Sequence, residues 1–167
     1  MDKKVKIGGN TMLIYQIPGK NDIEIENIVF DYNGTIAVDG KVIEGVSDLL
    51  VDFRDEVEIY ILTADTYGTV KQECIDLDAK LLTFSSENTS ELKKNIVKEL
   101  NGEKTICVGN GFNDISMFKE AAISIAVIEA EGVCGQLLKH ADIITRSILE
   151  AIEIILNENK IKAVLRS

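Results

Sequence analysis

The stretch Asp31-Tyr32-Asn33-Gly34-Thr35 decides the fold, and it directly follows the apolar run Ile28-Val29-Phe30. A short apolar run before turn residues predicts a buried strand, with Asp31 at its C-terminal end. Ligands of open α/β sheets bind outside the carboxyl ends of the strands. A carboxylate placed there can act as a nucleophile toward phosphorus. A second carboxylate two positions on could serve as acid and base, but Asn33 stands there.

Apolar runs that predict strands alternate along the chain with segments of helical periodicity. Strands are predicted at 12–15, 28–30, 57–62, 80–84, 105–108, 123–127 and 142–144, and helices at 44–54, 66–77, 87–100, 112–121, 132–139 and 147–156, with 161–165 extending the last helix. Asp39-Gly40, flanked by β-branched residues, predicts a two-residue hairpin over 36–43. The alternation predicts an α/β fold with a mostly parallel sheet covered on both faces. We expect one domain over 1–167, with residues 1–11 poorly ordered.

Composition and charge exclude several classes of function. The formal charge is 18 − 28 = −10, which argues against non-specific binding to nucleic acid or to an anionic membrane. No apolar run reaches the ~18–20 residues of a membrane span, and the first residues lack the apolar core of a signal peptide. The three cysteines form no CxxC pair, which favours reduced thiols in a cytoplasmic protein.

Polar residues follow several of the predicted strands at the same edge of the sheet. Thr63 ends the strand at 57–62, and Asn110 and Asp114 follow the strand at 105–108. Lys93 and Lys94, at the start of a predicted helix, could reach this edge. Convergence of such groups at one edge is what a catalytic site requires.

Four segments in this order resemble the motifs of the haloacid dehalogenase (HAD) superfamily, whose members are mostly phosphohydrolases. DYNGT at 31–35 resembles DxDGT, and the hairpin at 36–43 resembles the family's flap. LTAD at 62–65 and GNGFND at 109–114 resemble the second and fourth motifs. The similarity is greatest to the phosphorylation domain of P-type ATPases and covers roughly residues 25–150. It implies a three-layer α/β/α Rossmann-like fold.

The resemblance implies a Mg²⁺-dependent phosphohydrolase that acts through an aspartyl phosphate. It implies the following site: a nucleophile, Asp31; further catalytic residues, Asn33, Thr63 and Lys93; phosphate contacts from Gly34, Thr63, Ala64, Lys93 and Asn113; and metal contacts from Asp31, the Asn33 carbonyl, Asn110 and Asp114. Asp114 could act on the metal directly or through water.

Some of these assignments have alternatives. Lys93 is preferred to Lys94 as the motif lysine because it precedes the apolar pair at 96–97 by three residues, as in the ATPases. Either lysine could instead be a solvated helix end. Thr63 could also cap a following helix, and Asp65 could either hydrogen bond to the site or cap that helix.

Two departures from the motifs weaken the expected chemistry. Asn33 replaces the Asp that protonates the leaving group and activates water, and an amide carries no proton at neutral pH. Asn110 replaces a direct metal ligand and removes one negative charge. We therefore expect slow turnover and a persistent phospho-Asp31. The alternatives are a phosphate-binding regulatory protein of little activity and a phosphotransfer module that depends on a partner.

Only 27 residues separate Thr35 from Thr63, which leaves no room for a large cap or a nucleotide-binding insertion. We expect an open site that accepts a phosphorylated substrate, including a large one. The N-terminal strand offers an edge through which a homo-oligomer could form.

Overall fold

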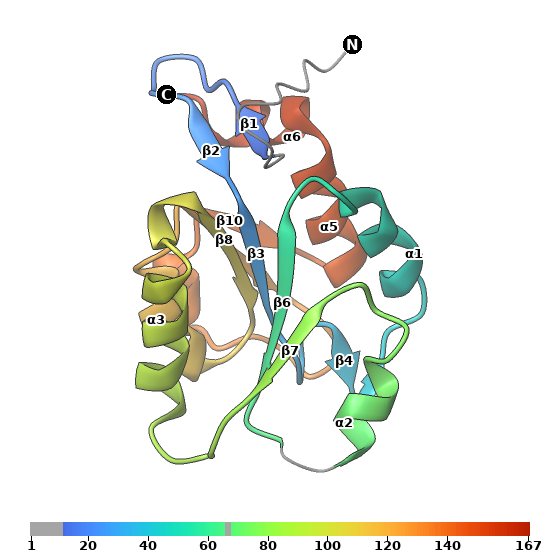
Figure 1. Cartoon of the computed structure of the whole chain (residues 1–167). Coiled ribbons are helices and arrows are strands. Elements are labelled where there is room, and N and C mark those ends of the chain that lie inside the picture. The colour runs from blue at the N-terminus through green and yellow to red at the C-terminus, as the bar shows by residue number, and fades with distance from the viewer. Residues whose placement is uncertain (1–11, 66–67) are drawn as a thin grey trace.

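The computed structural model describes residues 12–65 and 68–167, and within them a six-stranded parallel sheet has the order β10-β9-β8-β3-β6-β7 (Figure 1). Its strands are β3 (Asn27–Asp31), β6 (Glu58–Thr63), β7 (Lys80–Thr83), β8 (Thr105–Gly109), β9 (Ile123–Val127) and β10 (Ile143–Thr145). β3 pairs with β6 on one side and β8 on the other. The register sets Asp31 opposite Leu62 and Phe30 opposite Val108, so three strand ends meet at one edge.

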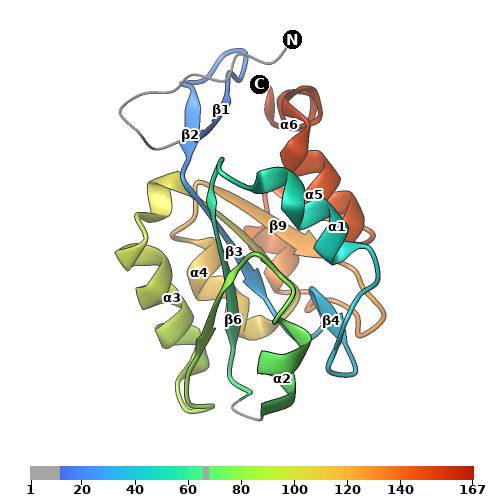
Figure 2. The same cartoon turned by 45° about the vertical axis from the view of Figure 1, so that its right-hand side comes forward.

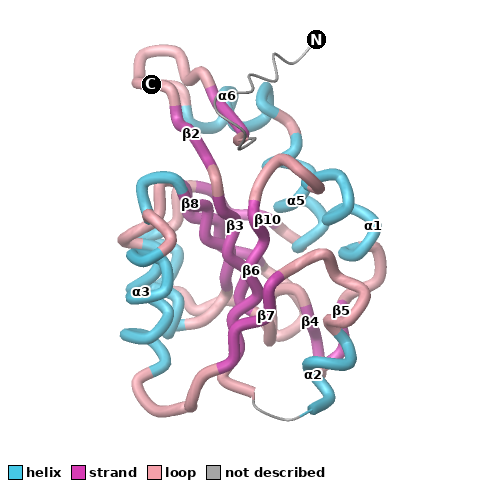
Figure 3. The backbone as a smooth tube through the Cα atoms, viewed as in Figure 1, coloured by secondary structure: helices cyan, strands magenta, loops and turns pink. Residues whose placement is uncertain are grey.

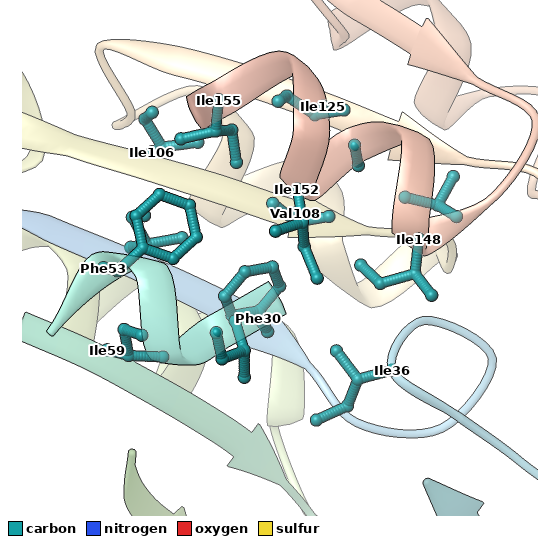
Figure 4. Packing of buried hydrophobic residues seen from close by; sticks show 14 of the residues in the cluster. Phe30, Ile36, Phe53, Ile59, Ile106, Val108, Ile125, Ile148, Ile152 and Ile155 are labelled. Atoms are coloured by element: carbon teal, nitrogen blue, oxygen red, sulfur yellow. The ribbon is translucent and has the colours of Figure 1, made fainter. Parts of the chain in front are cut away.

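Successive residues of β3 enter two different cores because side chains alternate across a strand. Ile28 and Phe30 belong to the larger core, with Phe53 and Ile152 among its members (Figure 4). Val29 belongs to the second core, on the other face of the sheet, together with Val97. All five residues of β3 are buried, which is why its sequence is apolar from Ile28 to Phe30, between the buried polar residues Asn27 and Asp31.

Helices cover both faces of the sheet and form the expected α/β/α layers (Figure 2). The larger core contacts α1 (Val46–Leu50), the 3-10 helix η1 (Val51–Phe53), α2 (Gly68–Glu73), α5 (Ile148–Leu156) and α6 (Glu158–Leu165). The second core contacts α3 (Thr89–Glu99), α4 (Ile115–Phe118) and the 3-10 helix η4 (Leu137–His140). Further 3-10 helices are η2 (Gly102–Lys104) and η3 (Phe112–Asp114). The predicted fold class is confirmed.

Two short antiparallel hairpins lie outside the main sheet. β1 (Leu13–Tyr15) pairs with β2 (Ile23–Ile25), and β4 (Ala37–Val38) pairs with β5 (Lys41–Val42). The turn between β4 and β5 has φ of 51° at Asp39 and 76° at Gly40, the two positive values that a type I′ hairpin turn needs. The hairpin predicted over 36–43 is therefore present, while its role as a flap stays a prediction, and Figure 3 shows β4 and β5 beside α2. Self-association through the N-terminal strand stays a prediction.

The structure corrects one predicted helix. Residues 132–139 were expected to be helical, but only η4 forms there, over Leu137–His140. Gly132 has φ +82°, and the backbone of Gly132 and Cys134 hydrogen bonds to Asn110 instead of within a helix. The expected helix at 112–121 is divided into η3 and α4 and ends at Phe118.

Some predictions fall partly on residues that the structure does not describe. They concern the order of residues 1–11 and the start of the helix predicted at 66–77. The single-domain assignment of 1–167 likewise stays a prediction. Among the described residues, no helix combines the length and the apolar character that a membrane span needs.

Candidate active site

The site centres on a buried ammonium group held between two carboxylates. Asp31 ends β3, and Lys93 lies in the second turn of α3, where it is only 1% exposed. Its Nζ donates to Oδ1 of Asp31 and, at 2.7 Å, to Oδ1 of Asp114. Lys94, the alternative, contacts Glu91 at the surface, with Nζ 3.4 Å from Oε1. The structure thus brings Lys93, and not Lys94, to the end of β3.

Asp114 is fully buried and organises the loop that follows β8. Its Oδ2 accepts the backbone amides of Asn110 at 3.0 Å and Gly111 at 2.9 Å. Its Oδ1 accepts from Lys93. Oδ2 thus accepts two hydrogen bonds and Oδ1 accepts one, so Oδ1 keeps acceptor capacity, and Asp114 can act on a cation directly, through water or through its charge.

Thr35 connects Asp31 to Asn110. Its Oγ1 lies 3.3 Å from Oδ2 of Asp31 and 3.3 Å from Oδ1 of Asn110, so two acceptor oxygens approach one hydroxyl. The nitrogen of the Asn110 amide donates to the carbonyl of Gly132 at 3.0 Å. These bonds orient the Asn110 oxygen toward Asp31. Reasoning from the sequence missed Thr35, although a hydroxyl four residues after Asp31 within DYNGT was a usable signal.

The oxygens at this edge fit Mg²⁺, which prefers hard oxygen ligands and retains several waters. They are Oδ2 of Asp31, Oδ1 of Asn110 and the carbonyl of Asn33. The Asn33 carbonyl accepts no hydrogen bond from the described part of the chain. The described residues contain no group of three His, Cys, Asp or Glu side chains that could hold a metal, and one of the three candidate ligand oxygens belongs to an amide, that of Asn110. These three oxygens therefore fit Mg²⁺, although only one of them belongs to a carboxylate.

Burial and charge determine the protonation states of Asp31 and Lys93. Burial, together with the nearby charge of Asp114, raises the pKa of Asp31 to about 7, although Lys93 and Thr35 act to lower it. Burial on its own would lower the pKa of Lys93, but the charges of Asp114 and Asp31 outweigh it and raise that pKa above its usual value. Lys93 is accordingly an ammonium at neutral pH. When both carboxylates are ionised, one positive charge serves two negative charges, which leaves a surplus negative charge that a cation would neutralise.

Thr63 lies at the end of β6, beside Asp31, and is 2% exposed. Its Oγ1 accepts the amide of Asp65 at 3.0 Å, which fixes a local turn and leaves the hydroxyl proton to be donated. Ala64 and Asn113 are half-buried near the same edge. Because residues 66 and 67 are not described, capping of the following helix stays a prediction.

Gly34 and Asn33, in the DYNGT stretch, have different surroundings, and the Gly34 amide does not point where the motif led us to expect. The amide of Gly34, expected to face the phosphate, donates instead to the carbonyl of Ala37 at 2.8 Å. Gly34 has φ +76°, and a Cβ built on it would lie 2.2 Å from Nδ2 of Asn110. The side chain of Asn33 is exposed and makes no hydrogen bond to the described residues. Gly34 therefore supplies space, and Asn33 faces solvent.

A family model described as haloacid dehalogenase-like hydrolase matches residues 92–151, the segment that carries Lys93, Asn110 and Asp114. The chain belongs to the HAD superfamily. An uncharacterized protein of Methanocaldococcus jannaschii is 36% identical to this HAD chain over 85 residues, which cover 50% of this chain and 91% of that protein.

Two further similarities carry descriptions of activity. A soluble P-type ATPase-like phosphatase of M. jannaschii is 28% identical over 125 residues, 72% of this HAD chain and 45% of that protein. The match thus spans less than half of that relative. Among solved structures, 3-deoxy-D-manno-octulosonate 8-phosphate phosphatase of Moraxella catarrhalis, in complex with magnesium, phosphate and KDO, has a TM-score of 0.63. It is 19% identical and aligns over 83% of this chain and 90% of that one, a likeness of fold.

Replacing Lys93 by methionine should lower the free energy of unfolding by about 3–5 kcal/mol, because it leaves two buried carboxylates without a counter-charge. Lys94→Met is the matched control, and its surface ion pair should be worth less than about 1 kcal/mol. Urea denaturation of both variants measures the difference. Equal losses would show that the buried ammonium does not hold the site together.

Replacing Gly34 by alanine should destabilise the protein more than the same change at Gly40. Both residues have φ +76°, but a Cβ at Gly40 meets nothing within 4 Å. Gly40→Ala should cost about 1 kcal/mol for the left-handed backbone alone. Gly34→Ala should cost about 1–3 kcal/mol more, because the Cβ displaces the amide of Asn110. Chemical denaturation compares the two variants, and similar costs would exclude the contact with Asn110.

Proposed function

We propose that this HAD hydrolase is a Mg²⁺-dependent phosphohydrolase that acts through a phosphorylated Asp31. The observation that carries the proposal is the ammonium of Lys93, buried at the catalytic edge and bonded to both Asp31 and Asp114. A buried, strongly paired lysine at the end of the central strand suits transfer of a phosphoryl group, which is catalysed mainly by positioning and charge.

The chemistry begins at the carboxylate of Asp31. An oxygen of Asp31 forms a bond to phosphorus, the bond to the leaving oxygen breaks, and that oxygen takes up a proton from solvent water. Water then attacks the aspartyl phosphate, releases inorganic phosphate and regenerates Asp31. Burial and the charge of Asp114 raise the pKa of Asp31 to about 7 even with Lys93 beside it, and the ammonium of Lys93 keeps this pKa from rising further, which favours the ionised nucleophile near neutral pH.

The phosphoryl group would be held by donors at neighbouring strand ends. Thr63 can donate its hydroxyl proton, and Lys93 offers charge, with Ala64 and Asn113 at the rim. Asp31, Asn110 and the carbonyl of Asn33 would hold Mg²⁺, with Asp114 acting through its charge. A bound Mg²⁺ would supply positive charge to the phosphoryl oxygens.

Similar proteins support the reaction class and the metal. The relative of M. jannaschii is described as a phosphatase, and the solved structure from M. catarrhalis is described with magnesium and phosphate bound. Between Thr35 and Thr63 this chain has only the flap, α1, η1 and β6. The site would therefore be open to a large phosphorylated partner.

Asn33 favours a second candidate, a phosphate-binding regulatory protein or a phosphotransfer module that depends on a partner. Its exposed side chain faces solvent without a hydrogen bond to the described residues, and its amide cannot exchange a proton at neutral pH. General acid–base catalysis is typically worth ~10²–10⁴ in rate. Without it, phosphorylated Asp31 should form and then persist.

Hydrolysis of para-nitrophenyl phosphate with Mg²⁺ tests the function, with Asp31→Asn as the control. The wild type should release phosphate slowly and retain label from a radioactive small phosphodonor, while Asp31→Asn should do neither. Chelation of the metal should abolish both signals. Hydrolysis that survives in Asp31→Asn would refute the proposed nucleophile, and label without hydrolysis would favour the phosphotransfer module. Absence of both signals in the folded wild type would favour the regulatory protein.

Replacing Asn33 by aspartate should raise turnover by ~10²-fold or more, because the new carboxyl can protonate the leaving group and then activate water. The fraction of labelled Asp31 at steady state should fall in parallel, since water attack would no longer be slow. Single-turnover decay of the label measures the second effect directly. A folded variant with unchanged decay would contradict the role assigned to position 33.

A further inference from the structure

Besides the bond from its backbone amide to Asp114 described above, Asn110 is held at three further points, only one of which concerns Asp31. Its Oδ1 faces Thr35, as described above. Its Nδ2 donates to the carbonyl of Gly132 at 3.0 Å, and its backbone carbonyl accepts the amide of Cys134 at 2.8 Å. The loop at 131–134, which overlaps the start of the helix expected at 132–139, is therefore bonded to the loop after β8 by a side-chain and a backbone hydrogen bond.

The same loop holds the flap. Oε1 of Glu131 accepts the backbone amide of Asp39 at 3.1 Å, at the turn of the hairpin. The next residue, Gly40, accepts the hydroxyl of Tyr32 at 2.9 Å. On the other strand, the amide of Val42 donates to Oε2 of Glu73 at 3.3 Å. Three residues outside the flap, Tyr32, Glu73 and Glu131, therefore hydrogen bond to it. Glu131 directly precedes Gly132, which accepts a hydrogen bond from Asn110.

We propose that Asn110 is a positioning residue whose amide nitrogen orders the flap, residues 36–43, through the loop at 131–134. An aspartate has the same shape as asparagine but offers only acceptors, so it would set a carboxylate oxygen against the carbonyl of Gly132. The amide at position 110 therefore removes one negative charge from the site and supplies the donor that fastens this loop. Any effect of this arrangement on catalysis rests on the proposed function. The ordering of the flap by Asn110 does not.

Hydrogen exchange of backbone amides in the intact protein tests the linkage without reference to activity. In Asn110→Asp, exchange of the amides of Asp39 and Cys134 should accelerate about tenfold, the effect of losing roughly one hydrogen bond. Asn33→Asp is the matched control, because it adds the same charge in the same site at a side chain that makes no hydrogen bond to the described residues. There, exchange at both amides should stay within about twofold of wild type. Amides in β3 report global stability and normalise the comparison.

Glu131→Ala separates the two links and keeps the test valid if Asn110→Asp fails to fold. It should accelerate exchange at Asp39 but leave Cys134 unchanged, since the bond from Cys134 to Asn110 remains. If the wild type hydrolyses para-nitrophenyl phosphate, Glu131→Ala should raise KM several-fold with kcat nearly unchanged. The proposal would be overturned if the amide of Asp39 exchanged at the wild-type rate in both Asn110→Asp and Glu131→Ala. It would also be overturned if Asn33→Asp accelerated exchange as much as Asn110→Asp does. Neither result would affect the role of Asp31.

Discussion

The rest of the site depends on one buried ammonium group that is shared by two carboxylates. Charges removed from water are tolerated in a protein interior only when they are paired and hydrogen bonded. Lys93 meets this condition for Asp31 and Asp114 together, and so it forces the end of β3, the second turn of α3 and the loop after β8 to meet. The parallel order β8-β3-β6 is what places these segments at one edge. Because one cation serves two anions, the assembled site remains an acceptor for a further positive charge.

Much of this arrangement is visible in the sequence because it follows from local patterns. A continuous apolar run that stops at Asp31 identifies both the buried strand and its exposed end, and the same reasoning finds Thr63 and Asn110. The Asp-Gly pair identifies the flap, since both turn residues must take positive φ. The sequence also favours Lys93 over Lys94, because Lys93 lies four residues before the buried Val97 and therefore on the same face of the helix.

What the sequence could not reveal is where backbone groups find their partners across the fold. Residues 132–139 have an apolar pattern compatible with a helix, yet the carbonyl of Gly132 and the amide of Cys134 bond to Asn110, a residue more than twenty positions earlier. The periodicity of the sequence does not show that a backbone group will hydrogen bond to a distant partner rather than within a helix. The bond from the Gly34 amide to Ala37 of the flap is hidden for the same reason, because a sequence motif identifies a residue but not the direction of its N–H group.

The two asparagines that replace carboxylates are therefore different kinds of departure. Asn33 is exposed and makes no hydrogen bond to the described residues, so its replacement of an acid changes only the chemistry available to a bound phosphate. Asn110 contacts Thr35, Gly132 and Cys134, so its replacement of an acid changes how the loops are held. On the proposed function, a metal site with less negative charge and the lack of an acid at position 33 would act in the same direction, because each would lengthen the time that a phosphorylated Asp31 survives. The proposed ordering of the flap by Asn110 would keep the flap beside it. A site with these properties would be better suited to holding a phosphoryl group than to releasing it rapidly.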